Sequence, residues 1–252
     1  MITSEISNGV CTITIARPEK KNALSMAMYA ELKRALDAAG PDNAVRAVLL
    51  TGQPNVFTAG NDLEDFLSAP PTTQDSPVVQ FMHALKSFEK PVIAAVTGAA
   101  VGIGVTMLLH CDLVYVSEDA RLSLPFVSLG LVPEYGASLL LPRLMGHVKA
   151  AEKLMLGAPF TAAEAVELGI ANAALPAGEV LSHARQTAER FNALPAGAVR
   201  ETKRLMRAGL SAAVDKTIND EITVFVERLQ SPEAKEAFRA FFEKRKPDFS
   251  RL

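Results

Sequence analysis

Glu134 occupies a place in the sequence where a carboxylate could act as a general base. It lies in residues 129–136, LGLVPEYG, directly after Pro133 and two residues before Gly136. Proline followed by glycine indicates a turn into the helix expected from residue 136, and an acid there could face a cleft. The spacing alone fits a second interpretation, an acid that only stabilises the positive end of a helix.

Two loops of small residues could provide backbone donors for a negatively charged ligand or intermediate. They are residues 58–62, TAGND, and residues 98–104, GAAVGIG, and the second opens a helix. Exposed N–H groups at such a place stabilise negative charge. The glycines could instead permit close packing of helix on strand. The second loop lacks the order G-x-G-x-x-G, which argues against a nicotinamide site.

Other classes of site find little support in this sequence. There is no G-x-S-x-G motif, and the histidines and cysteines have no metal-binding or redox spacing: His83, His110, His147, His183, Cys11 and Cys111. We therefore expect no metal. The formal net charge of −2 gives no general attraction to nucleic acid, and no apolar run is long enough to span a bilayer.

The elements that must position these loops alternate between strand and helix, which predicts the α/β class. Residues 2–6 and 10–15 form an expected hairpin around Asn8-Gly9, and Ser25 caps a helix that runs to residue 39. Apolar runs predict strands, and the last third of the chain is expected to be mainly helical. The expected strands are residues 46–51, 91–96, 112–116 and 121–124.

Taken in order, several segments resemble the crotonase, or enoyl-CoA hydratase/isomerase, superfamily over nearly the whole chain. They are residues 17–24 (RPEKKNAL), 57–62 (FTAGND), 90–96 (KPVIAAV), 98–104, 111–112 (CD) and 241–246 (FFEKRK). The resemblance implies an α/β spiral of ββα turns in residues 1–195, which carries the acyl-CoA site. It also implies a C-terminal helical trimerisation region in residues 196–252, and hence a homotrimer or a hexamer made of two trimers.

The shared chemistry of this family is stabilisation of a thioester enolate by two backbone N–H groups. The resemblance assigns these donors to Ala59 and Ile103. Where the family's hydratases carry two glutamates, this chain has Thr106 and Phe126. Neither side chain can serve as a general base at neutral pH, so ordinary hydration is expected to be weak.

The motifs around residues 57–63, 98–106 and 129–138 resemble the branch that isomerises 3-enoyl-CoA to trans-2-enoyl-CoA in β-oxidation-type fatty-acid metabolism. Glu134 matches that branch's single base, which would move a proton from C2 to C4 of a dienolate. Thr106, Phe126 and Leu131 are expected in the acyl pocket. Another reaction of the family, such as hydration or thioester hydrolysis, and a silent CoA-binding relative remain alternatives.

The resemblance also implies a set of coenzyme A contacts, with the CoA thioester as substrate and no separate cofactor. The expected contacts are Lys20, Lys21, Gly60, Asn61, Asp62, Leu63, Phe241 and Lys244. A solvated basic face is an equal interpretation of the lysines. A cytoplasmic location is expected, although Ser250-Arg251-Leu252 resembles a peroxisomal address.

Overall fold

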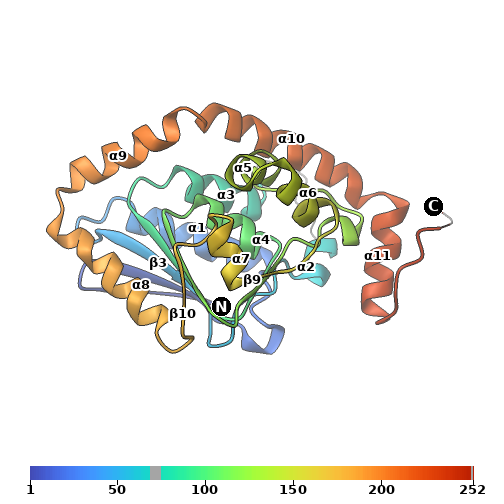
Figure 1. Ribbon diagram of the computed structural model, residues 1–252, viewed down its shortest axis with the longest axis horizontal. Coiled ribbons are helices and arrows are strands. Elements are labelled where there is room, and N and C mark those ends of the chain that lie inside the picture. Colours follow the sequence, from blue (N-terminus) through green and yellow to red (C-terminus); the bar gives the residue numbers. More distant parts are fainter. Residues whose placement is uncertain (69–74, 251) are drawn as a thin grey trace.

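A computed structural model describes residues 1–68, 75–250 and 252, and its first element is the expected hairpin (Figure 1). Strands β1 (Ile2–Ser7) and β2 (Val10–Ile15) pair in antiparallel register. Asn8 and Gly9 between them both have positive φ, 46° and 75°, as a two-residue hairpin turn requires. The hairpin prediction is confirmed, and β2 joins the remaining sheet.

Among the described residues, the larger sheet has six strands in the order β1-β2-β3-β5-β7-β10, and every pair after the hairpin is parallel. The added strands are β3 (Ala47–Thr51), β5 (Val92–Val96), β7 (Leu113–Ser117) and β10 (Ala173–Leu175). Side chains alternate between two buried faces. Val48 and Leu50 join the main core, whereas Ala47 and Leu49 pack with helix α8 (Val180–Glu189).

The strands of a second, smaller sheet follow the order β4-β6-β8-β9. Its strands are β4 (Val56–Thr58), β6 (Ala99–Val101), β8 (Arg121–Ser123) and β9 (Phe160–Thr161). Along the chain, β3, β5 and β7 are each followed by a strand of this second sheet. Each repeat thus gives one strand to each sheet, which confirms the predicted crotonase-like spiral of ββα turns. The strands β4 and β6 were not predicted, and they overlap the expected loops of residues 58–62 and 98–104.

Helices fill the turns of the spiral and follow it. Their order is α1 (Met26–Ala39), α2 (Leu63–Ser68), α3 (Pro77–Ser87), α4 (Ile103–Thr106), α5 (Ala137–Met145), α6 (His147–Met155) and α7 (Ala162–Glu167), with four short 3₁₀ turns at Pro18–Lys20, Met107–His110, Val127–Leu129 and Arg190–Ala193. Ser25 accepts a hydrogen bond from Met28 N at 3.4 Å and caps α1 as expected.

Three further helices, α9 (Ala196–Ala208), α10 (Ser211–Leu229) and α11 (Pro232–Phe242), close the described chain. In Figure 1 they form an orange-to-red arch over α3 and α5, and α11 descends at the far end. Pro195, the N-cap of α9, stands at the predicted boundary, and the division into two domains stays a prediction. No helix within the described residues is long and apolar enough to cross a membrane. Arg251 of the C-terminal tripeptide lies outside them.

Candidate active site

Three loops meet because three neighbouring strands end at the same edge of the smaller sheet. Strands β4, β6 and β8 are parallel, so the residues that follow them emerge side by side. Ligand sites of α/β proteins form at this carboxyl edge. Gly60, Gly102 and Phe126 stand in these three loops, and all three residues line one groove of about 660 Å³.

The first two loops present one backbone N–H each, and each donor follows a glycine with positive φ. Gly60 has φ +88° and Gly102 has φ +56°. A Cβ on Gly60 would come within 2.9 Å of Val101 O, so the absence of a side chain lets the first loop lie against the end of β6. Asn61 and Ile103 come next in the chain, and both residues line the groove.

Asn61 N–H faces away from its neighbouring chain segment. Leu24 N donates to Gly60 O at 2.8 Å, and Asp62 N donates to Leu24 O at 2.9 Å. In a parallel bridge of this kind the residue between the two bonds, here Asn61, turns its own N–H to the other side. Ile103 N–H begins α4 and has no acceptor within the helix. Across residues 1–68, 75–250 and 252, neither N–H donates a hydrogen bond.

The donor role predicted for Ala59 is contradicted by this geometry. Ala59 N–H donates to Lys21 O at 3.0 Å, so it is committed to the loop around residue 21. The free N–H of this loop is two residues further on, at Asn61. The signal in the sequence was Gly60 itself, because a glycine with positive φ redirects the peptide that follows it.

Glu134 lines a small cavity that adjoins this groove, and only 4% of its surface is exposed. Thr106 Oγ1 donates a hydrogen bond of 2.5 Å to Glu134 Oε1. Glu134 Oε2 is buried and has no hydrogen-bond partner among the described residues. Burial raises the pKa of Glu134 to about 8; the bond from Thr106 works against this shift, and the charge of Glu221 adds to it. Neither oxygen accepts from an N–H of the helix start among the described residues, which argues against an acid that only stabilises the positive end of a helix.

The backbone after Glu134 is held in an unusual conformation by buried contacts. Tyr135 has φ +63°, which is costly for a bulky residue. Its hydroxyl donates to Met82 O at 2.8 Å, and its carbonyl lies 2.8 Å from His110 Nε2. Burial lowers the pKa of His110 to about 4, so the ring is neutral at pH 7 and Nε2–H can donate. These contacts fix the direction in which Glu134 points.

Glu221, on α10, completes the support of the Glu134 loop. Its carboxylate accepts hydrogen bonds from Gly136 N at 2.6 Å, from Ser138 N at 2.9 Å and from Ser138 Oγ at 2.5 Å. These groups form the start of α5, whose first N–H groups lack helical partners. A C-terminal helix thereby anchors the Glu134 loop, a role for Glu221 that the sequence pattern did not reveal.

The groove brings together the residues expected to contact coenzyme A. It is lined by Lys20, Lys21, Gly60, Asn61, Asp62, Leu63, Phe241 and Lys244, together with Ala59, Ile103, Phe126 and Leu131. Of the three residues expected in the acyl pocket, Phe126 and Leu131 lie in this wall. The third, Thr106, is fully buried and reaches Glu134 instead.

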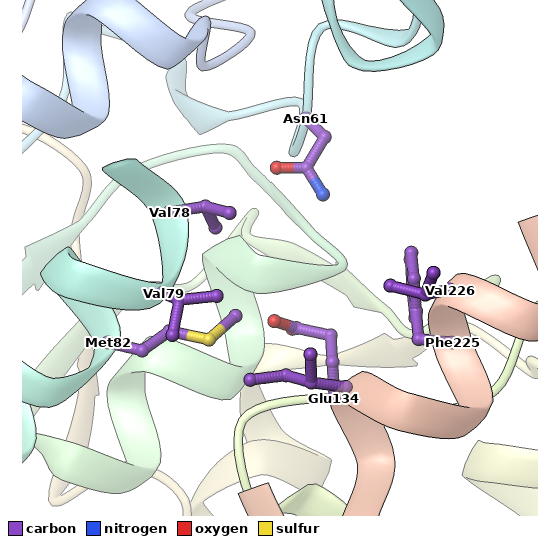
Figure 2. A pocket seen from close by; sticks show the side chains of 8 residues that line it. Asn61, Val78, Val79, Met82, Glu134, Phe225 and Val226 are labelled. Atoms are coloured by element: carbon purple, nitrogen blue, oxygen red, sulfur yellow. The ribbon is translucent and has the colours of Figure 1, made fainter. Parts of the chain in front are cut away.

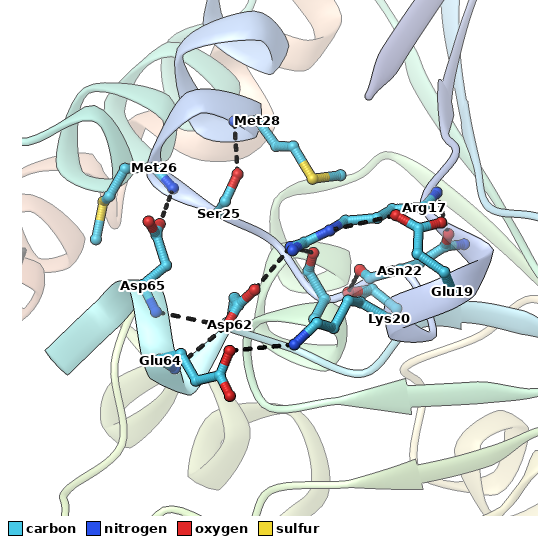
Figure 3. A network of polar contacts seen from close by, with 12 residues as sticks. Arg17, Glu19, Lys20, Asn22, Ser25, Met26, Met28, Asp62, Glu64 and Asp65 are labelled. Carbon is cyan, nitrogen blue, oxygen red and sulfur yellow. Dashed lines mark hydrogen bonds and ion pairs between the residues drawn. The ribbon is translucent and has the colours of Figure 1, made fainter. Parts of the chain in front are cut away.

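Asp62 was expected to contact coenzyme A, but its side chain also holds the loop and the start of α2 together (Figure 3). Its carboxylate pairs with Arg17 at 2.8 Å and accepts from Glu64 N and Asp65 N at the start of α2. Burial raises the pKa of Asp62, but these hydrogen bonds outweigh burial and leave the pKa lowered. Its side chain is thus committed to the loop, and Arg17 is a supporting residue that sequence reasoning missed.

A second, much smaller cavity of about 20 Å³ adjoins Glu134 (Figure 2). Helix α3 contributes Val78, Val79 and Met82, and helix α10 contributes Ile222, Phe225 and Val226. Asn61 and Phe225 line both this cavity and the groove, so the two spaces meet there. Tyr29 OH donates to Asn61 Oδ1, which holds the Asn61 side chain at the junction.

Known proteins resemble this chain over nearly its whole length. The family model described as "Enoyl-CoA hydratase/isomerase" matches residues 5–251. A probable enoyl-CoA hydratase of Bacillus subtilis is 33% identical, with 98% of both chains covered. The peroxisomal enoyl-CoA delta isomerase 3 of Mus musculus is also 33% identical, over 96% of this chain and 77% of that protein. The solved structure of Pseudomonas aeruginosa OdaA matches with TM-score 0.94 and 54% identity, covering 95% of this chain and 98% of that one.

Proposed function

Because the chain belongs to the enoyl-CoA hydratase/isomerase family, we propose that it isomerises 3-enoyl-CoA to trans-2-enoyl-CoA. The observation that carries this proposal is the buried carboxylate of Glu134, which lines the small cavity beside Asn61 and keeps one oxygen without a hydrogen-bond partner among the described residues. Proton transfer from C2 to C4 needs one base that keeps the proton between the two steps. Hydration by the family's two-carboxylate route needs a second acid. This chain has Thr106 and Phe126 at the two positions where the family's hydratases carry glutamates.

In the proposed reaction, the groove binds the coenzyme A part of the substrate. The thioester oxygen accepts hydrogen bonds from Asn61 N–H and Ile103 N–H, which stabilise the charge that develops as the proton leaves C2. One such donor contributes roughly 3 kcal/mol to lowering a barrier of this kind. Glu134 Oε2 takes the C2 proton, giving a dienolate and a neutral carboxyl group. That group then protonates C4, and the double bond ends between C2 and C3.

The environment of Glu134 suits both halves of this cycle. A base with a pKa of about 8 is a better proton acceptor than an ordinary carboxylate, and its acid form is not too weak to give the proton back. The mainly apolar surround also limits loss of the proton to water. Thr106 holds Oε1, which leaves Oε2 as the oxygen that exchanges the proton.

The decisive experiment compares conversion of 3-hexenoyl-CoA to 2-hexenoyl-CoA by wild type and Glu134→Gln. We expect turnover to fall by about 10²–10⁴-fold, the usual contribution of a positioned general base, while hexanoyl-CoA still binds. Glu179→Gln, at an exposed glutamate that lines neither space, is the matched control and should retain full activity. Equal turnover of wild type and Glu134→Gln would refute the assignment of the base.

Hydration is the second candidate, since relatives of equal identity are named hydratases and the small cavity beside Glu134 could hold about one water molecule. Product analysis with crotonyl-CoA separates the two reactions. The proposal expects 3-hydroxybutyryl-CoA to form at least about 100-fold more slowly than 2-hexenoyl-CoA forms from its isomer, because a second positioned acid is worth about that factor. Comparable rates would make hydration the principal activity.

A further inference from the structure

The small cavity between α3 and α10 limits what can lie beyond the reacting carbons. Its volume of about 20 Å³ corresponds to roughly one or two water-sized groups, since a single probe-sized space needs about 10–15 Å³. Glu134 and Asn61 are its two polar lining residues among those the structure describes. In Figure 2 the labelled side chains of both helices surround the space on which the Glu134 carboxyl group and Asn61 border.

The position of this cavity gives the direction of the acyl chain, on the premise of the proposed function. The thioester oxygen lies at Asn61 N–H in the groove, and Glu134 must reach both C2 and C4. Asn61 and Phe225 line both spaces, and Glu134 lines the small one. A chain that extends past C4 therefore enters the cavity between α3 and α10.

We propose that this enzyme is selective for short hydrocarbon acyl chains of up to roughly six carbons, because the cavity leaves space for about one or two groups beyond C4. The walls are valine, methionine, isoleucine and phenylalanine side chains, and the described lining holds no lysine or arginine. A terminal carboxylate would be buried there without a counter-charge, which is costly. The substrate class is therefore short, uncharged 3-enoyl thioesters.

The α3 wall of the cavity cannot easily yield to a longer chain. Val79 and Met82 are 1% and 4% exposed and belong to the main core cluster. The backbone of Met82 is also tied to the Glu134 loop, because its carbonyl accepts from Tyr135 OH. Protein interiors are close-packed, so making room for extra methylene groups forces side chains or backbone to move.

The test measures kcat/KM for 3-hexenoyl-CoA, 3-dodecenoyl-CoA and 3-hexenedioyl-CoA in wild type, Met82→Ala and Met28→Ala. Met82 is the methionine of the wall. Met28 is an equally buried methionine of the same core cluster that lines neither space, so it controls for loss of packing. Binding of hexanoyl-CoA and dodecanoyl-CoA is measured calorimetrically on the same proteins, which reports on the chain without requiring turnover.

We expect wild type to prefer the six-carbon over the twelve-carbon thioester by at least 10-fold in both turnover and binding, and to reject the dicarboxylic one. Met82→Ala should reduce that preference at least 5-fold, and Met28→Ala should leave it unchanged. Equal use of both chain lengths by wild type, or an unchanged preference in Met82→Ala, would overturn the inference. Absence of isomerisation with every thioester would instead refute the proposed function, and the binding preference would still decide the inference.

Discussion

At the scale of single residues, Thr106 shows how a site can be adapted by one substitution. Its hydroxyl contributes no base, yet it donates to Glu134 and leaves one carboxylate oxygen without a partner among the described residues. A hydrogen bond to the charged form lowers a carboxyl pKa, so Thr106 moderates the upward shift that burial causes. We infer that it positions Glu134 and tunes its proton affinity.

Replacing Thr106 tests this positioning role. Glu134 is active when deprotonated, so kcat/KM should rise with pH through an apparent pKa of about 8 in wild type. Thr106→Val removes the donor, and the inflection should move to higher pH with about a 10-fold lower kcat. Thr106→Ser keeps the hydroxyl and should restore the wild-type profile. Identical profiles for the valine variant and wild type would show that the hydroxyl has no such role.

Residue-level prediction from sequence named residues that the fold brings together, but it could not give the direction of a backbone N–H. Glu134, Ile103 and all the expected coenzyme A contacts lie around one groove and its adjoining cavity, and their roles stay predictions. The donor assigned to Ala59 was wrong because the direction of an N–H depends on local φ, here that of Gly60. Arg17 and Glu221 went unnoticed because their partners are distant in sequence.

At the scale of elements, the site depends on α10 as much as on the spiral. Glu221 caps the start of α5 behind Glu134, and Ile222, Phe225 and Val226 of the same helix form one wall of the small cavity. The chain's long elements were predictable because they carry clear periodicity, as α1 and the β1–β2 hairpin do. Strands β4 and β6 were missed since three residues carry too short a pattern.

The substitution Glu221→Gln tests the link between α10 and the catalytic loop. It replaces one acceptor oxygen by an NH₂ group that faces another donor, so we expect about 1–3 kcal/mol lower stability and a several-fold lower kcat. The charge of Glu221 raises the pKa of Glu134, so the pH profile should move to lower pH, opposite to Thr106→Val. Asp220→Asn, at an exposed neighbour paired with Lys216, should change neither quantity. A profile that stays in place would contradict the link.

At the scale of the whole molecule, burial of Glu134 makes stability depend on pH. Its pKa in the folded chain is raised to about 8 from an ordinary 4.5. A raised carboxyl pKa means that the folded state holds the proton more tightly than the unfolded state. The proton on Glu134 therefore adds to the free energy of unfolding in full below about pH 4.5, and this stabilisation is lost as pH rises through 8. Wild type should lose up to a few kcal/mol relative to Glu134→Gln between pH 5 and pH 9. Thermal unfolding of both proteins at pH 5 and pH 9 measures this difference. An equal change in stability of wild type and Glu134→Gln between the two pH values would contradict the prediction.

Several large apolar side chains on α6 and α9 remain exposed in the single chain. Val148 is 81% exposed, Leu205 is 64% and Met206 is 80%. Apolar surface of this kind is typical of a surface covered by another subunit. We expect a homotrimer or a hexamer made of two trimers, with three or six times the 26.9 kDa mass of one chain, and multi-angle light scattering of the purified protein tests it. A single-chain mass at micromolar concentration would rule out both assemblies.

Gly60 and Gly102 have a genetic consequence, because the two donors that follow them belong to the main chain. Every codon except one for proline still encodes an N–H at positions 61 and 103. A different side chain at position 61 or 103 therefore leaves the N–H itself in place, whereas an added Cβ at Gly60 meets Val101 O. Inheritance of the proposed enolate-stabilising donors thus rests on the conformation of the two glycines and not on the side chains of the residues that carry the N–H groups.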